Sequence, residues 1–201
     1  MQIHNVEQRS EEWYAVKAGV PSSSMFHAAL AEGRGKTDSA TRRSYMLRLA
    51  GERLTGEPMD SYQNHHMQRG IEREREALRL YAFAYDQKPH AVGFIRNGDI
   101  GCSPDGLIGA DGLVEVKDKL PHLQIDVLDR GEVPSVHATQ LQGQLLVTCR
   151  SWVDFVSHCR GLPLFVKRVH RDEKRIAQIK LGLQTFCDEL EFLVEKIRAM
   201  Q

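Results

Sequence analysis

The sequence lacks an excess of charge of either sign. Its 27 Lys and Arg residues balance 27 Asp and Glu residues, so the formal net charge is zero. A strongly basic chain is the usual electrostatic sign of a nucleic-acid partner. Bulk charge therefore gives no indication of such a partner, and any surface that binds nucleic acid would have to be a local basic patch.

Paired cysteines and long apolar runs are also lacking. The four cysteines, Cys102, Cys149, Cys159 and Cys187, show no CxxC pair and no zinc-type spacing with histidine. We expect free thiols in a reducing cytoplasm. The N-terminal segment MQIHNVEQRSEEW carries charge where a secretory signal needs an apolar stretch, and no later run approaches the ~20 apolar residues that span a bilayer. The sequence predicts a cytoplasmic protein with no membrane partner.

The chain does contain enough apolar material for one core. Its 201 residues are 41% hydrophobic, which fits one domain over residues 1–201. Apolar residues at spacings of three and four predict helices, and these lie at residues 38–55, 66–86, 134–147 and 176–197. The narrow stripe of the last helix is typical of packing on the protein's own core, and an intersubunit role is the alternative.

Short β-prone runs predict a sheet in the middle of the chain. Asn-Gly and Asp-Gly dipeptides separate several of them, which favours antiparallel hairpins. The predicted strands are residues 92–96, 100–103, 107–109, 113–117, 152–158 and 164–170, and residues 118–133 are predicted to be irregular. This order of elements predicts an α/β fold with a central mixed β-sheet flanked by helices.

A GRGKT run at residues 33–37 resembles part of a phosphate-binding loop. That loop requires a glycine where Leu30 stands and a strand before it, and neither is present. The run therefore does not predict an ATPase. A basic loop that touches the DNA backbone and a plain connector are both compatible with it.

The most informative residues are SPDG at 103–106 and LVEVK at 113–117. Side chains alternate along a strand, so Glu115 and Lys117 share one face while Val114 and Val116 share the other. A hairpin across the nine intervening residues returns Asp105 beside Glu115. Two neighbouring carboxylates repel each other unless a cation lies between them, and oxygen ligands suit Mg²⁺ or Mn²⁺. A lysine beside them orients the attacking water and offsets charge that builds on a phosphate.

Each half of this pattern is common by itself, because PDG is a frequent turn and ExK occurs in many solvated strands. Their combination on one predicted hairpin is much more specific. An ionised Glu115 and Lys117 in an otherwise apolar strand also need a reason to be retained. The pattern indicates metal-assisted hydrolysis of a phosphodiester.

This pattern, in which nine residues separate PD from ExK, resembles the motif of the PD-(D/E)xK nuclease superfamily. One branch is more similar. The segments EEWYAVKAGVPSSS, RGIEREREAL, SPDG with LVEVK, and ATQLQGQLLVTCRSWVDFV resemble, in that order, the phage lambda exonuclease (YqaJ-like viral recombinase) family. This resemblance covers most of the chain and implies a restriction-endonuclease-like core.

The resemblance also implies roles for individual residues on the predicted hairpin. Asp105 and Glu115 match the metal-binding carboxylates, and the main-chain carbonyl of Val116 matches a further metal ligand. Lys117 matches the catalytic lysine. The implied cofactor is Mg²⁺, with Mn²⁺ as a substitute.

Two further matches lie on predicted helices. Glu72 matches a helix glutamate beside the metals, and Gln140 matches the glutamine of the QxQ motif. A solvated helix face is the alternative for each. The sequence departs from the family at Asp118, where Cys, Ser or Thr is usual, and at His137, where Tyr is usual. Asp118 adds a negative charge next to the site.

Three residues match the family's 5′-phosphate pocket, namely Lys17, Ser24 and Ser103. A cation and two hydroxyl donors can neutralise and orient a terminal phosphate. Lys17 stands where arginine is usual in the family, which predicts weaker binding of the phosphate. The alternatives are a helix-capping role for the serine run at 22–24 and a solvated charge for Lys17.

The implied activity is Mg²⁺-dependent 5′-to-3′ digestion of one strand of linear double-stranded DNA, which leaves 3′ single-stranded tails for phage-type recombination. The resemblance further implies a ring-shaped homotrimer, a single-strand annealing protein as partner, and a phage or prophage setting in the cytoplasm of a bacterial host. Two alternatives stay open: a catalytically silent DNA-binding recombination scaffold, and a sequence-specific endonuclease with the same core.

Overall fold

A computed structural model describes residues 1–33, 39–59 and 65–200. Residues 34–38, and with them most of the GRGKT run, lie outside the described residues, so neither interpretation of that run is tested. Within the described ranges, no helix is both long and apolar enough to cross a membrane.

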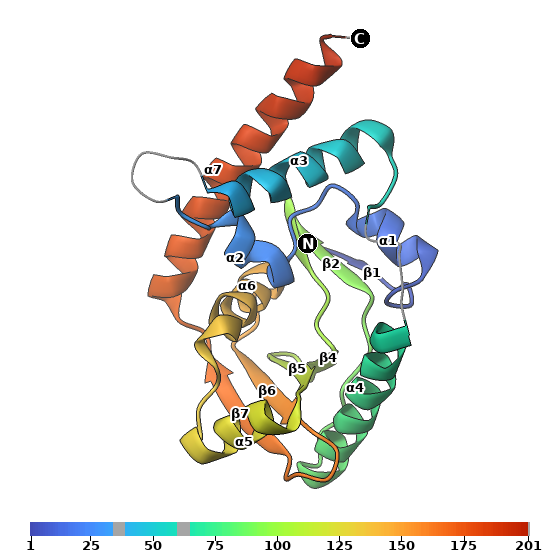
Figure 1. Ribbon diagram of the computed structural model, residues 1–201, viewed down its shortest axis with the longest axis vertical. Helices are drawn as coiled ribbons and strands as arrows, with labels where there is room; N and C mark the ends of the chain where they lie inside the picture. The colour runs from blue at the N-terminus through green and yellow to red at the C-terminus, as the bar shows by residue number, and fades with distance from the viewer. Residues whose placement is uncertain (34–38, 60–64, 201) are drawn as a thin grey trace.

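The elements follow the mixed order expected of an α/β chain (Figure 1). The helices are α1 (Glu11–Lys17), α2 (Phe26–Ala29), α3 (Ala40–Thr55), α4 (His65–Ala84), α5 (Pro121–Arg130), α6 (Ala138–Thr148) and α7 (Glu173–Arg198), with 3₁₀ turns η1 (Ser23–Met25) and η2 (Ser135–His137). The strands are β1 (Gln2–His4), β2 (Phe94–Asn97), β3 (Ile100–Cys102), β4 (Gly106–Ile108), β5 (Gly112–Asp118), β6 (Trp152–His158) and β7 (Phe165–His170).

A mixed four-stranded sheet in the order β4-β5-β6-β7 is the framework of the fold. Strand β5 pairs antiparallel with β4 and parallel with β6, which pairs antiparallel with β7. Val114 and Val116 pack against Tyr81 of α4, whereas Leu113 packs against Leu145 of α6. The two helices therefore cover opposite faces of the sheet, and Glu115 and Lys117 share the α6 side with Leu113.

Strands β1, β2 and β3 form a second, antiparallel sheet. The turns predicted at Asn97-Gly98 and Asp111-Gly112 form hairpins, which belong to different sheets. The hairpin predicted at Asp105-Gly106 is wrong, because β3 and β4 on its two sides do not pair. The single sheet predicted over residues 92–117 is therefore divided in two. The chain passes from one sheet to the other at residues 103–105.

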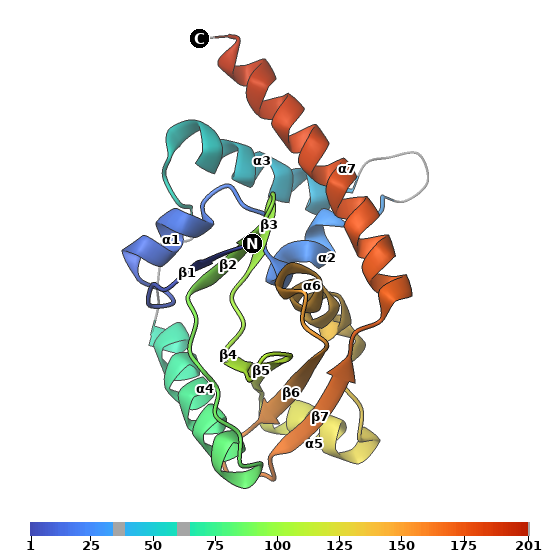
Figure 2. The same ribbon diagram turned by 180° about the vertical axis from the view of Figure 1, so that it is seen from behind.

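Helix α7 runs past α3 and α2 and extends beyond the body of the fold (Figure 2). The predicted apolar stripe of α7 is buried at Leu183, Phe186 and Leu190, in one cluster with Tyr45 and Leu49 of α3. Core packing of this stripe is confirmed.

The structure corrects the prediction of an irregular segment at 118–133, because α5 lies there. Pro121 occupies the first turn of α5, and Gly131 ends the helix with a φ of +61°. Gln124 and Val127, three residues apart, form its buried face. An early proline and a terminal glycine are recognised helix boundaries, so the sequence did carry the signal. Helix α1, whose Ser10 caps the N-terminus, was also not predicted.

Candidate active site

Asp105 is held against β5 by main-chain hydrogen bonds. Its Oδ2 accepts from the N–H of Val116 at 2.7 Å, and its own N–H donates to the carbonyl of Val114 at 3.1 Å. The turn after β3 therefore places the Asp105 carboxylate beside the strand that carries Glu115. Gln8 supports this turn from the N-terminal segment, since its Nε2 donates to the carbonyl of Pro104 at 2.9 Å.

Glu115 is buried, with 3% of its surface exposed, and both of its carboxylate oxygens accept hydrogen bonds. Lys117 Nζ, at 2.6 Å, and Gln140 Nε2, at 2.5 Å, donate to Oε1. Gln144 Nε2 donates to Oε2 at 2.6 Å. The predicted site residues Glu115, Lys117 and Gln140 are thus in direct contact. The role of Gln144 was not predicted, although its spacing of four from Gln140 puts both glutamines on one helix face.

The electrostatics of this cluster show that negative charge is poorly compensated around Asp105. Burial, and then repulsion from Glu115, raise the pKa of Asp105 well above its ordinary value, against the opposing effects of the Val116 N–H and Lys117. Burial by itself would lower the pKa of Lys117, but attraction to Glu115 and the hydrogen bond to it leave that pKa raised. The ammonium of Lys117 is therefore stabilised in its charged form.

A cavity of about 160 Å³ opens onto these side chains. The residues proposed from the sequence for phosphate binding, Lys17, Ser24 and Ser103, line the same cavity as Asp105 and Lys117. Residues from four separate parts of the chain therefore meet there. Ser22, which precedes η1, makes no side-chain capping bond, so the structure gives no support for a capping role of this serine.

Trp13 connects two of the three residues in the proposed phosphate pocket. Its indole Nε1 donates to Ser103 Oγ at 2.9 Å and to the carbonyl of Gly93 at 3.1 Å. Lys17 Nζ lies 4.5 Å from the centre of the Trp13 ring, within the range of a cation–π interaction. No role for Trp13 was predicted from the sequence. It lies in the cavity wall at one turn's distance from Lys17.

The helix carboxylate that lines this cavity is Glu74, and Glu72 is exposed and lines neither of the cavities described here. Residues two apart on a helix point about 200° apart, so only one of the two faces inward. Glu74 lies three residues before the buried Ala77 and seven before the buried Tyr81, so it continues their stripe. This spacing is the signal that distinguishes Glu74 from Glu72.

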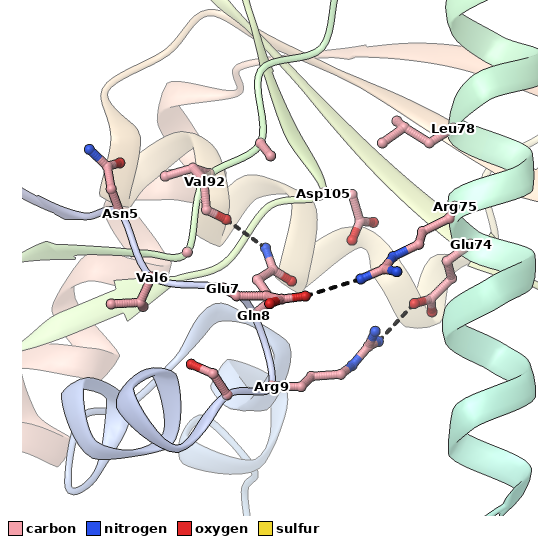
Figure 3. Close-up of a pocket in the computed structure, with 13 residues that line it drawn as sticks. Asn5, Val6, Glu7, Gln8, Arg9, Glu74, Arg75, Leu78, Val92 and Asp105 are labelled. Atoms are coloured by element: carbon pink, nitrogen blue, oxygen red, sulfur yellow. Dashed lines mark hydrogen bonds and ion pairs between the residues drawn. The ribbon is translucent and has the colours of Figure 1, made fainter.

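A larger cavity of about 790 Å³ adjoins the first and shares Gln8, Arg9, Glu74 and Asp105 with it (Figure 3). The N-terminal segment forms one wall and α4 forms the other. Arg9 reaches from the first wall to Glu74, with 2.7 Å between Nη2 and Oε2. The two cavities thus meet at the Asp105 carboxylate and at this ion pair.

The extra carboxylate at Asp118 is paired. Its Oδ1 lies 3.2 Å from His158 Nδ1, and its Oδ2 lies 3.3 Å from Arg73 Nη1. Lys119 and His137 form a second polar pair near the site, 2.7 Å apart. Burial, followed by the charges of Lys119 and Lys117, lowers the pKa of His137 to about 4.

These observations define the class of the fold. A mixed sheet with two carboxylates and a lysine on its central hairpin, flanked by helices, is the PD-(D/E)xK restriction-endonuclease-like core. The chain belongs to the YqaJ-like viral recombinase family, whose domain matches residues 12–151.

Solved structures support this assignment. An alkaline exonuclease from Laribacter hongkongensis, LHK-Exo, is 33% identical over 95% of this chain and 97% of its own, with a TM-score of 0.84. LHK-Exo in complex with dAMP gives a TM-score of 0.85 at the same identity and coverage. A phage-related exonuclease from Haemophilus somnus 129PT, 15% identical over 89% of this chain and 96% of its own, shares the fold with a TM-score of 0.68. A comparison with curated proteins gave no match.

Proposed function

We propose that the protein is a metal-dependent deoxyribonuclease that digests one strand of linear double-stranded DNA from its 5′ end and leaves a 3′ single-stranded tail. The observation that carries this proposal is that one small cavity is lined by Asp105, Glu115, Lys117, Lys17 and Ser103 together. It joins groups suited to phosphodiester hydrolysis to groups suited to a terminal phosphate. The similarity to LHK-Exo, an alkaline exonuclease, supports the same activity.

Asp105, Glu115, the carbonyl of Val116 and Glu74, in place of Glu72, are the groups that would hold Mg²⁺, or Mn²⁺ as a substitute. Among the described residues, no group of three or more His, Cys, Asp and Glu side chains is already arranged around a metal position. The donor set nevertheless fits, because hard oxygen ligands suit these ions. A cation would also offset the burial and the repulsion from Glu115 that raise the pKa of Asp105. A bound ion supplies Lewis-acid activation of the phosphate and the attacking water.

The chain's own residues orient the reacting groups. Lys117, charged and hydrogen-bonded to Glu115, is placed to neutralise charge that develops on the phosphate. Gln140 and Gln144 hold the two oxygens of Glu115 in position.

Lys17, Ser24 and Ser103 would bind the 5′-phosphate of the digested strand. Ser103 is two residues before Asp105, so a phosphate held there sets the position of the next linkage over the carboxylates. A lysine provides a point charge rather than the planar fork of arginine, and we propose a modest preference for phosphorylated ends.

The deciding experiment compares linear with closed circular duplex DNA in Mg²⁺. Progressive loss of the linear substrate, with a 5′ label released first and circles left intact, is the expected result. Asp105→Asn, Glu115→Gln and Lys117→Ala should each lower turnover by orders of magnitude while DNA affinity falls much less.

Each alternative has its own outcome. Cleavage of circles at defined sites would identify a sequence-specific endonuclease. DNA binding without hydrolysis in Mg²⁺ or Mn²⁺ would identify a silent recombination scaffold. Release that begins at the 3′ end would reverse the proposed polarity.

We also propose that the active form is a homotrimer that acts in the cytoplasm of a bacterial host, with a phage-type single-strand annealing protein as partner. A ring around DNA would account for processive digestion by a chain of zero net charge. Sedimentation at micromolar protein tests the trimer, and a pull-down with the annealing protein tests the partner.

A further inference from the structure

Arg9 has a backbone conformation that an arginine rarely adopts. It lies in a turn at residues 7–10, closed by a 3.1 Å hydrogen bond from the N–H of Ser10 to the carbonyl of Glu7. Its φ is +72°, in the left-handed region where glycine is favoured. A strained residue persists when its surroundings hold it and its side chain has a use.

The side chain of Arg9 lies at the boundary between the two cavities and lines both of them. Figure 3 shows it crossing the space between the N-terminal segment and α4 toward Glu74. The neighbouring Gln8 anchors the turn, since its Nε2 donates to the carbonyls of Val92 and Pro104 at 2.8 and 2.9 Å. The turn therefore places the guanidinium at Glu74, on the boundary between the two cavities that Asp105 also lines.

The larger cavity provides room for DNA beyond the site of cleavage. Its volume, about 790 Å³, lies within the ~300–1,000 Å³ of pockets that bury organic ligands. It shares Asp105 with the smaller cavity, which contains the proposed phosphate anchor. Val6, Leu78 and Val92 give it apolar surface suited to a sugar or base.

We propose that Arg9 binds a backbone phosphate of the digested strand where that strand passes from the small cavity into the large one. The proposal rests on the nuclease function proposed above. A guanidinium fork matches two phosphate oxygens, and charge-assisted hydrogen bonds of this kind are strong. Glu74 is an ion-pair partner of Arg9 in the free protein, and on binding the phosphate takes its place.

Arg9→Gly is a sharp test, because glycine suits a φ of +72° and removes only the side chain. Binding of linear duplex DNA is measured in Ca²⁺ over a range of salt concentrations, together with thermal unfolding. We expect an unchanged or higher Tm, about tenfold weaker binding, and a slope of log affinity against log salt reduced by about 0.7–0.9, the loss of one phosphate contact. Arg9→Lys should keep most of the slope and recover part of the affinity.

Arg130→Ala is the matched control, since it removes one exposed cation on α5 outside both cavities. It should leave the slope, the affinity and the Tm unchanged. An Arg9→Gly variant with the slope of the unmutated protein would overturn the proposal, whether or not its stability falls. Failure of the unmutated protein to bind linear duplex at all would instead overturn the proposed function, and this inference with it.

Discussion

Trp13 Nε1 donates a hydrogen bond to Ser103 Oγ at 2.9 Å, across 90 residues of sequence. With that oxygen accepting from the indole, the hydroxyl proton of Ser103 is free to point elsewhere, including into the cavity. The same ring carries the ammonium of Lys17 at 4.5 Å. One tryptophan therefore positions both a hydroxyl and a cation of the proposed phosphate pocket.

Trp13→Phe should reduce discrimination between 5′-phosphorylated and 5′-hydroxyl ends. Phenylalanine keeps an aromatic face under Lys17 but removes the partly buried hydrogen bond to Ser103, and a hydrogen bond contributes about 0.5–1.5 kcal/mol. The measurement is the ratio of the initial rate on phosphorylated ends to the rate on hydroxyl ends, which we expect to fall toward one. Tyr14→Phe, which alters the ring that packs edge-on against Trp13, is the control. An unchanged ratio in Trp13→Phe would show that the indole N–H does not position Ser103.

Gln144→Met should lower the apparent affinity for Mg²⁺ by about 10–100-fold, the range for residues that orient a metal ligand. Gln144 is fully buried, and its Nε2 donates a hydrogen bond to Glu115. Its Oε1 has no hydrogen-bond partner among the described residues. A titration of reaction rate against Mg²⁺ measures the effect.

Gln142→Met is the matched control for Gln144. Gln142 is also buried on α6, but it bonds the carbonyl of His170 and the N–H of Asp172, away from the cavity. Its replacement should cost about 1–3 kcal/mol of unfolding free energy and leave the Mg²⁺ titration unchanged. Identical titrations for the two variants would contradict the assigned role of Gln144.

Gly143→Ala should destabilise the protein by about 1–3 kcal/mol, because a Cβ there would lie 2.5 Å from the ring of the buried Phe26. Relief of that clash moves η1 away from α6 and displaces Ser24 from the cavity, so the rate on phosphorylated ends should fall too. Gly51→Ala in α3 is the control. Its nearest neighbour is 3.8 Å away, and alanine should raise helix stability by up to about 1 kcal/mol. Urea unfolding measures both, and equal stability of the two variants would contradict the packing argument.

His137 predicts a pH dependence of stability. Its pKa is lowered from 6.5 to about 4 by burial and by Lys119 and Lys117. In the unfolded chain His137 becomes protonated near pH 6.5, whereas in the folded protein it becomes protonated only near pH 4. This histidine therefore contributes stability above pH 6.5 that is lost as the pH falls toward 4. In His137→Gln this contribution disappears. Urea unfolding between pH 7 and 4 should show the unmutated protein losing more stability than the variant, and parallel curves would contradict the shift.

Local patterns sufficed to predict much of the fold. Asn-Gly and Asp-Gly turns predicted the β2–β3 and β4–β5 hairpins, and alternation along β5 predicted that Glu115 and Lys117 share a face. These features depend only on neighbours in the sequence. The stripe of α7 was informative for the same reason, since its period alone defines the buried face.

Features that depend on distant contacts were missed. The second sheet depends on the pairing of β1 with β2. The paired residues Gln2 and Arg96 are more than 90 residues apart in the chain. The roles of Trp13 and Gln8 arise from contacts to Ser103 and Pro104 across 90 and 96 residues. The structure places Glu74, and not the predicted Glu72, in the cavity wall, and the helical phase of the buried Tyr81 is a local signal that favours Glu74.

The passage between the two sheets has a consequence for heat inactivation. The chain leaves β3 at Cys102 and enters β4 at Gly106, so Ser103 and Asp105 serve both as the joint of the two sheets and as members of the proposed site. We expect that warming separates the two sheets, and so displaces these residues, before either sheet unfolds. Catalysis should therefore stop below the temperature of unfolding. Substitutions that strengthen the contact between the two sheets should raise the temperature of inactivation more than substitutions that improve packing within either hydrophobic core.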